Sequence, residues 1–156
     1  MIMALLLIVI LVVLGFGFLG SRVGQYQSTG KAVNAAQARA VAYAGIEDVR
    51  SKMNLDIAFP PSVGIGQSSF TYSEDLTDTS GSRVGTYRIT LDSSKAQTAP
   101  YFILSITSTG FVGPKNSPLA THTYRAFMDV SPILNPPSPT YFRIVRLDDL
   151  GERYQP

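Results

Sequence analysis

Residues 1–21 decide the architecture of this chain, and they read MIMALLLIVILVVLGFGFLGS. No residue in this stretch is charged, and the first ionisable side chain is Arg22. Fourteen of the first twenty residues are Leu, Ile, Val or Phe. At roughly −0.3 to −0.6 kcal/mol each, they favour a lipid-like environment by about 4 to 8 kcal/mol. About 20 helical residues suffice to cross the core of a bilayer. The stretch therefore predicts a helix that is apolar on every side and that needs lipid or other helices around it.

The composition of the whole chain narrows the class of protein. Among its 156 residues there is no cysteine, which excludes disulfides, thiolate metal sites and thiol nucleophiles. The 13 basic and 11 acidic residues give a net charge of +2, and the cations are scattered, so no nucleic-acid partner is predicted. The apolar run has no basic residue before it and no A-x-A cleavage site after it, unlike a signal peptide. We therefore expect the run to be retained, with Met1 as a processed N-terminus.

Four glycines lie within ten residues at the end of the apolar run and just beyond it: Gly15, Gly17, Gly20 and Gly24. Each glycine costs a helix interior up to about 1 kcal/mol relative to alanine. The group predicts a flexible joint in which the helix thins, bends or locally melts. Small residues also let membrane helices approach closely. Both interpretations stay open, and they are compatible.

Residues 31–54 return to strong helical character and read KAVNAAQARAVAYAGIEDVRSKMN. Apolar side chains recur there at spacings of three and four and form one stripe: Ala35, Ala38, Ala42, Ile46, Val49 and Met53. Asn54 and the following Pro60–Pro61 pair predict the end of the helix. If the two helical segments form one nearly continuous helix, it would extend about 80 Å. That is longer than the diameter of a globular domain with this number of residues. We therefore expect an apolar helix half at 1–30, which protrudes and needs a partner, and a globular domain at 31–156.

Short stretches with period-two alternation follow between about residues 68 and 147. They are Phe70 and Tyr72; Val84, Tyr87, Ile89 and Leu91, with Gly85 as a bulge; Tyr101 to Ile106; Tyr124, Ala126, Met128 and Val130; and Tyr141 to Arg146. The short connections between them favour antiparallel neighbours. The sequence thus predicts an α+β fold: a long protruding N-terminal helix whose C-terminal half packs on a four- or five-stranded antiparallel sheet.

These features together resemble the type IV pilin and pseudopilin family. The run from Ala4 to Gly15, ALLLIVILVVLG, is similar to the apolar half of a mature pilin helix. The stretch containing Ala38, Ala42 and Ala44-Gly45-Ile46-Glu47 is similar to the Ala-rich segment of the minor-pilin branch. The resemblance covers residues 1–54, and the sheet agrees with it in kind.

The resemblance implies a structural subunit of a type IV pilus-like extracellular filament. Such a subunit loses a short leader, is methylated at its new terminus, waits in the inner membrane and is then extracted by the membrane assembly machinery. Its partners are the membrane, that machinery and copies of itself. Filament-core packing would fall to apolar residues of the first half: Ala4, Leu5, Leu6, Leu7, Ile8, Ile10, Leu11 and Leu14.

One residue departs from the family pattern. Most pilins carry Glu at the fifth mature position, where it pairs with the terminal amine of a neighbour, and this chain has Leu5. The departure favours an alternative function, a minor pilin or pseudopilin that primes or tips a pilus or a type II secretion pseudopilus. A third hypothesis is a membrane-tethered periplasmic binding or adaptor domain.

Reactive chemistry has little support in the sequence. His122 is the only histidine, and a lone histidine without clustered carboxylates indicates a structural role. Asp148, Asp149 and Glu152 suggest a solvated C-terminal turn, with cation binding as the alternative. No phosphate-cradling loop, nucleophile elbow or zinc-ligand spacing is present. The sequence therefore predicts no enzyme, no cofactor and no metal site.

Overall fold

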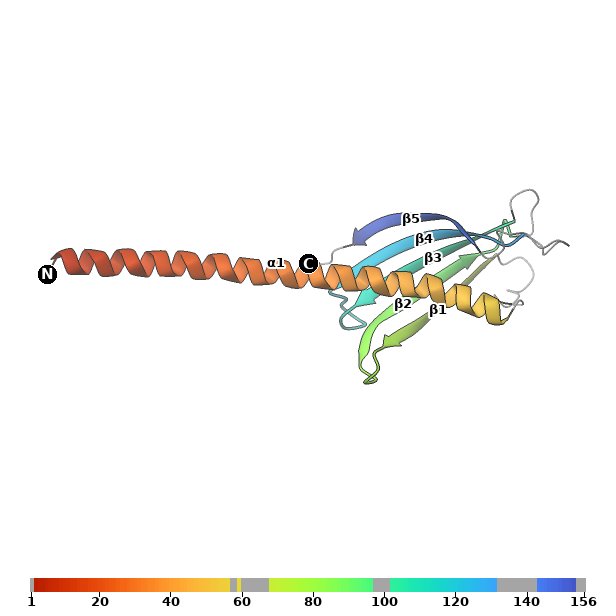
Figure 1. Ribbon diagram of the computed structural model, residues 1–156, viewed down its shortest axis with the longest axis horizontal. Coiled ribbons are helices and arrows are strands. Elements are labelled where there is room, and N and C mark those ends of the chain that lie inside the picture. Colours follow the sequence, from red (N-terminus) through yellow and green to blue (C-terminus); the bar gives the residue numbers. More distant parts are fainter. Residues whose placement is uncertain (1, 57–58, 60–67, 97–101, 132–142, 154–156) are drawn as a thin grey trace. The chain divides into compact units, whose positions relative to one another are not determined.

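The computed structural model describes residues 2–56, 59, 68–96, 102–131 and 143–153, without the side chains of Leu5, Glu152 and Arg153. One helix, α1 (Ile2–Leu55), is followed by five strands (Figure 1). The strands are β1 (Ser69–Thr77), β2 (Arg83–Asp92), β3 (Ile103–Val112), β4 (Ala120–Asp129) and β5 (Ile144–Arg153). The chain divides into two units, Met1–Val33 and Asn34–Pro156.

Helix α1 is continuous in its hydrogen bonding over 54 residues and contributes to both units. It passes through all four glycines between residues 15 and 24 as helix. It ends at Leu55, one residue beyond the predicted stop at Asn54. Lys52 lies in the last turn, where a positive charge interacts favourably with the negative end of the helix dipole.

The five strands form one antiparallel sheet in the order β1-β2-β3-β4-β5, so every strand pairs with its neighbour along the chain. This meander is the arrangement that short connections favour. Near the β1–β2 turn, Leu76 pairs with Gly85 and Thr77 pairs with Arg83, which leaves Val84 as an extra residue. The bulge predicted at Gly85 therefore lies one position earlier in the chain.

Two strands extend beyond their predicted ends. β3 continues through the polar stretch Ser105–Thr109, because these residues pair with β4 and alternate between the two faces of the sheet. The fifth strand was predicted near 141–146, but β5 runs from Ile144 to Arg153. The solvated C-terminal turn predicted at Asp148, Asp149 and Glu152 is therefore wrong: these residues pair with Arg125, Tyr124 and His122 of β4. Tyr101, Tyr141 and Phe142 lie outside the described residues.

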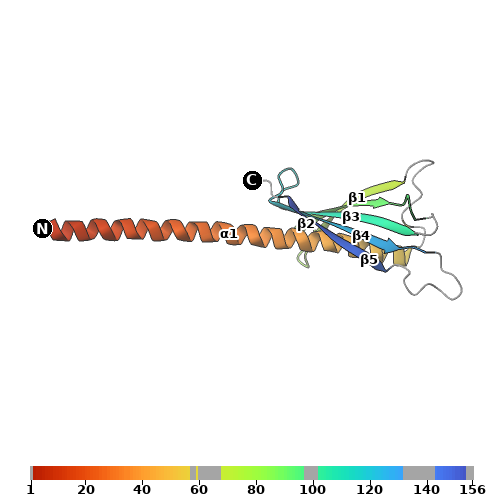
Figure 2. The same ribbon diagram turned by 90° about the horizontal axis from the view of Figure 1, so that it is seen from above.

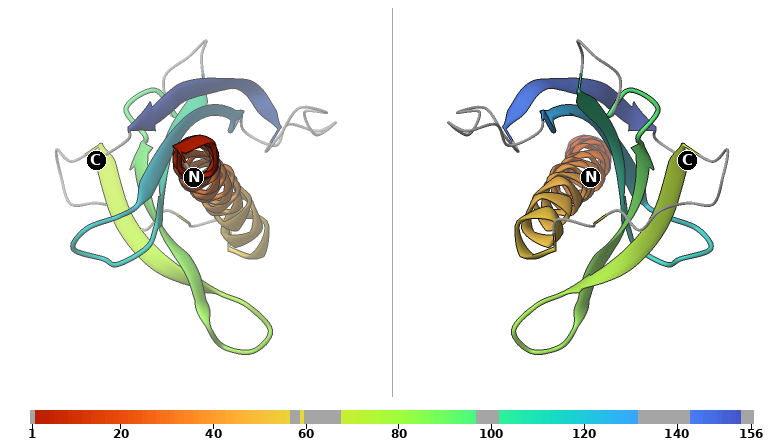
Figure 3. Two further views of the ribbon diagram at one scale, coloured as in Figure 1. Left: turned by 90° about the vertical axis from the view of Figure 1, so that its left-hand side faces the viewer. Right: turned by 90° about the vertical axis from the view of Figure 1, so that its right-hand side faces the viewer.

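The core of the second unit lies between the C-terminal part of α1 and one face of the sheet. The sheet lies on one side of this part of the helix (Figure 2) and curves around it (Figure 3). The predicted helical stripe is confirmed, since Ala38, Ala42, Ile46, Val49 and Met53 are all buried and Ala35 is half-buried. The strands contribute the opposite half of the core: Tyr87, Ile89, Leu91, Leu104, Ile106, Val112, Ala126 and Met128.

Small residues allow the helix and the sheet to approach closely. A Cβ on Gly110 of β3 would lie 2.4 Å from the carbonyl oxygen of Ala38 and 2.5 Å from the amide nitrogen of Ala42. Beside it, buried Ser108 donates a hydrogen bond of 2.7 Å from its Oγ to the carbonyl oxygen of Ala42. A Cβ on Gly45 of α1 would meet Ser108 Oγ at 2.6 Å. The helix backbone therefore lies directly on β3, and this contact fixes the position of residues 38–45 on the sheet.

Candidate functional site

The apolar first part of α1 is the largest exposed hydrophobic surface among the described residues. Every described side chain from Ile2 to Val33 is exposed. The predicted packing residues belong to this surface: Ala4, Leu6, Leu7, Ile8, Ile10, Leu11 and Leu14 are all exposed, for example Leu11 at 60%. The side chain of Leu5 and the whole of Met1 lie outside the described residues. This helix is long and apolar enough to cross a membrane, and a soluble monomer rarely exposes so large an apolar patch.

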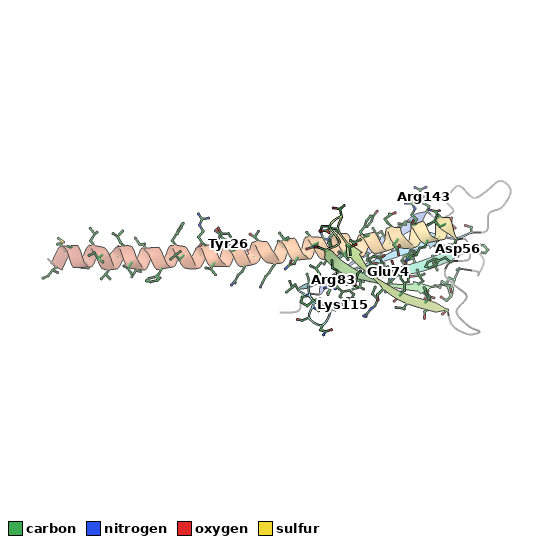
Figure 4. The ribbon with its side chains drawn as sticks, turned by 90° about the horizontal axis from the view of Figure 1, so that it is seen from below. Tyr26, Asp56, Glu74, Arg83, Lys115 and Arg143 are labelled. Atoms are coloured by element: carbon green, nitrogen blue, oxygen red, sulfur yellow. The ribbon has the colours of Figure 1, made fainter. Side chains whose placement is uncertain are left out.

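The polar end of this surface begins at Arg22. Its guanidinium carbon lies 5.0 Å from the centre of the Phe18 ring, one helical turn back. Such a cation–π contact lets a long cationic side chain cover apolar surface while its charge stays in water. The exposed ring of Tyr26, labelled in Figure 4, follows one turn later. Arginine and tyrosine are residues typical of the boundary between lipid and water.

The four glycines at 15, 17, 20 and 24 lie on open helix surface. A Cβ built on any of them would meet no atom within 4 Å. Contacts within the described chain therefore do not require glycine at these positions. Two physical reasons remain for placing glycine there: close approach by another helix, or a lower cost of bending. Both are the interpretations that the sequence left open.

A polar cluster joins the C-terminal part of α1 to β1 and β2, and we call Asp48, Lys52, Tyr72, Glu74 and Tyr87 the clamp. Lys52 Nζ donates hydrogen bonds to Asp48 Oδ2 at 2.7 Å and to Glu74 Oε1 at 2.5 Å. The Tyr72 hydroxyl donates to Asp48 Oδ2 at 2.8 Å, and the Tyr87 hydroxyl donates to Glu74 Oε2 at 3.0 Å. Charge-assisted hydrogen bonds of this kind are stronger than neutral ones.

Burial and charge shift the ionisation of the clamp. For Tyr72, burial is the largest cause and the hydrogen bond to Asp48 the next, and both raise the pKa of the phenol. For Tyr87, burial and the hydrogen bond to Glu74 raise the pKa in the same way. Burial lowers the pKa of Lys52, but its hydrogen bonds and charge interactions with Asp48 and Glu74 outweigh burial, so the net shift is upward. The clamp is therefore most favourable with both phenols neutral and the ammonium charged.

His122 is buried in β4, on the helix-facing side of the sheet, 1% exposed. Its Nε2 lies 3.0 Å from Asp149 Oδ1 of β5, and its ring lies 4.6 Å from that of Tyr124. Tyr124 in turn packs edge-on against Tyr43 of α1, with ring centres 6.4 Å apart. On β5, Asp148 accepts a bond of 2.7 Å from Arg146 Nε. Asp148 and Asp149, two of the carboxylates for which cation binding was the alternative prediction, therefore have different partners. Asp149 links β5 to β4, and Asp148 pairs with a residue of its own strand.

No set of three or more His, Asp or Glu side chains close enough to hold a metal ion occurs within residues 2–56, 59, 68–96, 102–131 and 143–153. Comparisons of this chain with models of known families, with curated proteins and with solved structures found no match.

Sequence reasoning identified the apolar surface but missed the clamp and the close approach at Gly110. The clamp combines Asp48 of α1 with Glu74 of β1, and only the packing of the helix on the β1–β2 pair brings them together. The available signal was Lys52, a cation four residues after Asp48, in register for an ion pair on one helix face. For Gly110, the signal was a glycine inside a stretch of alternating residues, which often marks close backbone approach.

Proposed function

We propose that this chain is a structural subunit of a type IV pilus-like filament, which assembles through the first part of α1. The observation that carries the proposal is a charge-free helical surface, exposed at every described side chain from Ile2 to Ser21. Because this surface has no polar face, water is a poor environment for it on every side. Lipid and copies of the same helix are the two environments that suit it equally.

The second unit supports this role because its core does not involve the apolar surface. Every residue of the described hydrophobic core lies at Ala38 or later. The first part of α1 is therefore available to a membrane before assembly and to a helical bundle afterwards. In a filament of this kind the five-stranded domain would form the outer surface, and the subunit would pass from the inner membrane to the cell exterior.

A single charge in the apolar surface tests the proposal. We expect Leu11→Arg to abolish filaments while the chain stays in the membrane. An arginine at a helix centre costs about 2.5 to 3.5 kcal/mol, which is less than the roughly 4 to 8 kcal/mol that the apolar run provides. Lipid lets a long cation reach the headgroups, whereas a bundle buries it without a partner. Leu7→Asp should also abolish filaments, because a bundle would bury its carboxylate without a partner. The measurement is electron microscopy of sheared surface material together with immunoblots of the membrane fraction.

The matched control is Leu119→Arg, which places the same charge on a half-exposed leucine of the second unit (52% exposed). This variant should still form filaments. Circular dichroism of each purified variant in neutral detergent should show an unchanged sheet. Normal filaments from Leu11→Arg would refute the proposal. So would wild-type cells whose protein remains monomeric in the membrane and never enters the sheared fraction, since that behaviour belongs to a tethered binding or adaptor domain.

A minor subunit that primes or tips the filament is the second candidate function. The observation that favours it is the lack of any acidic side chain between Ile2 and Ile46, so the helix brings no carboxylate of its own into a bundle. The copy number decides between the two candidates. Immunogold label along the whole shaft would indicate the main subunit, and label restricted to one end would indicate the minor one.

A further inference from the structure

A small groove with charged, hydroxyl and apolar residues in its lining lies on the face of the sheet that α1 does not cover. Its volume is about 160 Å³, and its lining includes Ser73 of β1; Arg83, Thr86 and Arg88 of β2; Phe111 of β3; and Lys115 of the β3–β4 connection. Figure 4 shows the labelled Arg83 and Lys115 beside each other at the same end of the sheet. Complete small-molecule sites usually enclose about 300 to 1,000 Å³. The groove is therefore suited to one group of a longer ligand.

Three cations line this groove, and contacts within the chain hold both arginines in place. Arg83 donates from Nη1 to Thr86 Oγ1 at 3.0 Å and from Nη2 to the carbonyl oxygen of Gly113. The guanidinium carbon of Arg88 lies 5.5 Å from the centre of the Phe111 ring. Because these contacts fix the side chains in advance, an anion bound here would order few additional rotamers.

One carboxylate, Asp75, accompanies the three cations. Its Oδ2 lies 2.8 Å from Lys115 Nζ, and its Oδ1 lies 3.9 Å from Arg83 Nη1. Lys115 is the first cause that lowers the pKa of the Asp75 carboxyl, followed by the hydrogen bond from Thr86. Asp75 is therefore ionised at neutral pH, and the groove carries a net charge of +2, from three cations and one anion. Such a site attracts an oxyanion.

The same face of the sheet, in the groove and beyond it, also carries many neutral hydroxyl groups. Paired positions on adjacent strands place them in three rows: Thr71, Thr90 and Thr107, which continue to Arg125; Ser73, Thr109 and Thr123, with Arg88 between Ser73 and Thr109; and Thr86 and Thr121, on either side of Phe111. Two pairs are close enough to hydrogen bond, Thr71 with Thr90 at 3.2 Å and Thr109 with Thr123 at 3.1 Å. Hydroxyl groups both donate and accept hydrogen bonds, so this surface is complementary to the hydroxyl groups of a sugar chain.

We propose that this face binds an acidic polysaccharide, with a sugar carboxylate in the groove between Arg83, Arg88 and Lys115 and neighbouring sugar hydroxyls on the threonine rows. Nucleic acid is a poorer fit. A single strand needs open aromatic faces for its bases, whereas on this face of the sheet Arg88 lies over the ring of Phe111 and Arg146 lies over the ring of Phe127. The proposal goes beyond filament formation and does not depend on it, since one copy of the chain carries the whole site.

Binding of polygalacturonate to the full chain in neutral-detergent micelles tests the proposal. The affinity, measured by isothermal titration calorimetry, should fall about twofold to fivefold in Arg88→Gln and in Lys115→Gln, the range expected for loss of one exposed ion pair. Asp75→Asn removes the competing carboxylate and should strengthen binding by a similar factor. Higher salt should weaken binding in every variant that binds.

The matched control is Arg50→Gln, which removes the same charge from an exposed position on α1 (side chain 49% exposed) and should leave binding unchanged. Circular dichroism establishes that each variant keeps its fold. Failure of the wild type to bind polygalacturonate, or an equal loss in Arg50→Gln, would overturn the proposal. Tighter binding of oligothymidylate would assign the groove to nucleic acid, and tighter binding of polyglutamate would assign it to an acidic protein. Either result would overturn the polysaccharide assignment.

Discussion

Individual residues set the distance between the helix and the sheet in the second unit. Gly110 has no side chain, and the backbone of Ala38 and Ala42 occupies the space where a Cβ would lie. Ser108, two residues earlier, contacts the helix through a buried hydrogen bond from its hydroxyl group to the Ala42 carbonyl oxygen. Because backbone atoms move less easily than side-chain ends, substitutions at Gly110 act on the whole contact between α1 and β3.

Gly110→Ala should therefore destabilise the second unit. An added methyl group in a close-packed core costs about 1 to 3 kcal/mol, and here it meets the helix backbone at 2.4 and 2.5 Å. The measurement is the urea midpoint of the full chain in detergent, followed by near-ultraviolet circular dichroism of its tyrosines.

The control for this prediction is Gly30→Ala, whose added Cβ meets no atom within 4 Å. That substitution should leave the midpoint of the sheet domain unchanged. Equal midpoints for Gly110→Ala and the wild type would show that the helix can move away from β3 without cost.

At the scale of the elements, sequence patterns predicted more of the helix than of the sheet. The helix is defined by its own periodicity, and its stripe from Ala38 to Met53 is buried as predicted. Strand ends depend on pairing with a neighbour. The sequence of β5, IVRLDDLGER, has no regular alternation after Leu147, yet it pairs with β4 as far as Arg153. In the first half of β5, the alternating sequence and the pairing with β4 both favour a strand. In the second half, only the pairing with β4 does.

The clamp between α1 and the β1–β2 pair predicts a loss of stability at alkaline pH. The raised pKa values of Tyr72 and Tyr87 mean that the folded phenols keep protons that the unfolded chain releases above about pH 10. Stability should therefore be constant below that pH and fall above it, by at most about 1.4 kcal/mol per pH unit for each phenol. The raised pKa of Lys52 also lowers stability at alkaline pH, because the unfolded chain loses the lysine proton at a lower pH than the folded chain does.

Urea midpoints between pH 8 and pH 11 measure this slope. Tyr72→Phe should give a shallower fall than the wild type, because one phenol no longer resists ionisation. Tyr26→Phe is the control, since Tyr26 is 78% exposed and lies in the first unit. Parallel slopes for Tyr72→Phe and the wild type would mean that the phenol of Tyr72 ionises as freely in the folded chain as in the unfolded one.

At the scale of the whole molecule, the two units differ in whether they bury their own apolar side chains. The second unit buries its own core and the first unit buries no described side chain. This division could be predicted from the sequence, because residues 1–21 lack charge and residues 31–54 carry a stripe on one face. The groove at Arg83, Arg88 and Lys115 could not be predicted in this way, because three separate segments supply its lining and only the register of β1, β2 and β3 brings them together.

Disulfide crosslinking is the most direct test of whether the apolar helix exchanges lipid for copies of itself. The chain has no cysteine, so Leu11→Cys introduces a single reporter at an exposed position of the apolar surface. After mild oxidation, the sheared filament fraction should contain covalent dimers of this variant, while the membrane-held pool should remain largely monomeric. Filaments in which Leu11→Cys stays monomeric under the same oxidation, with no dimer in the sheared fraction, would contradict the account.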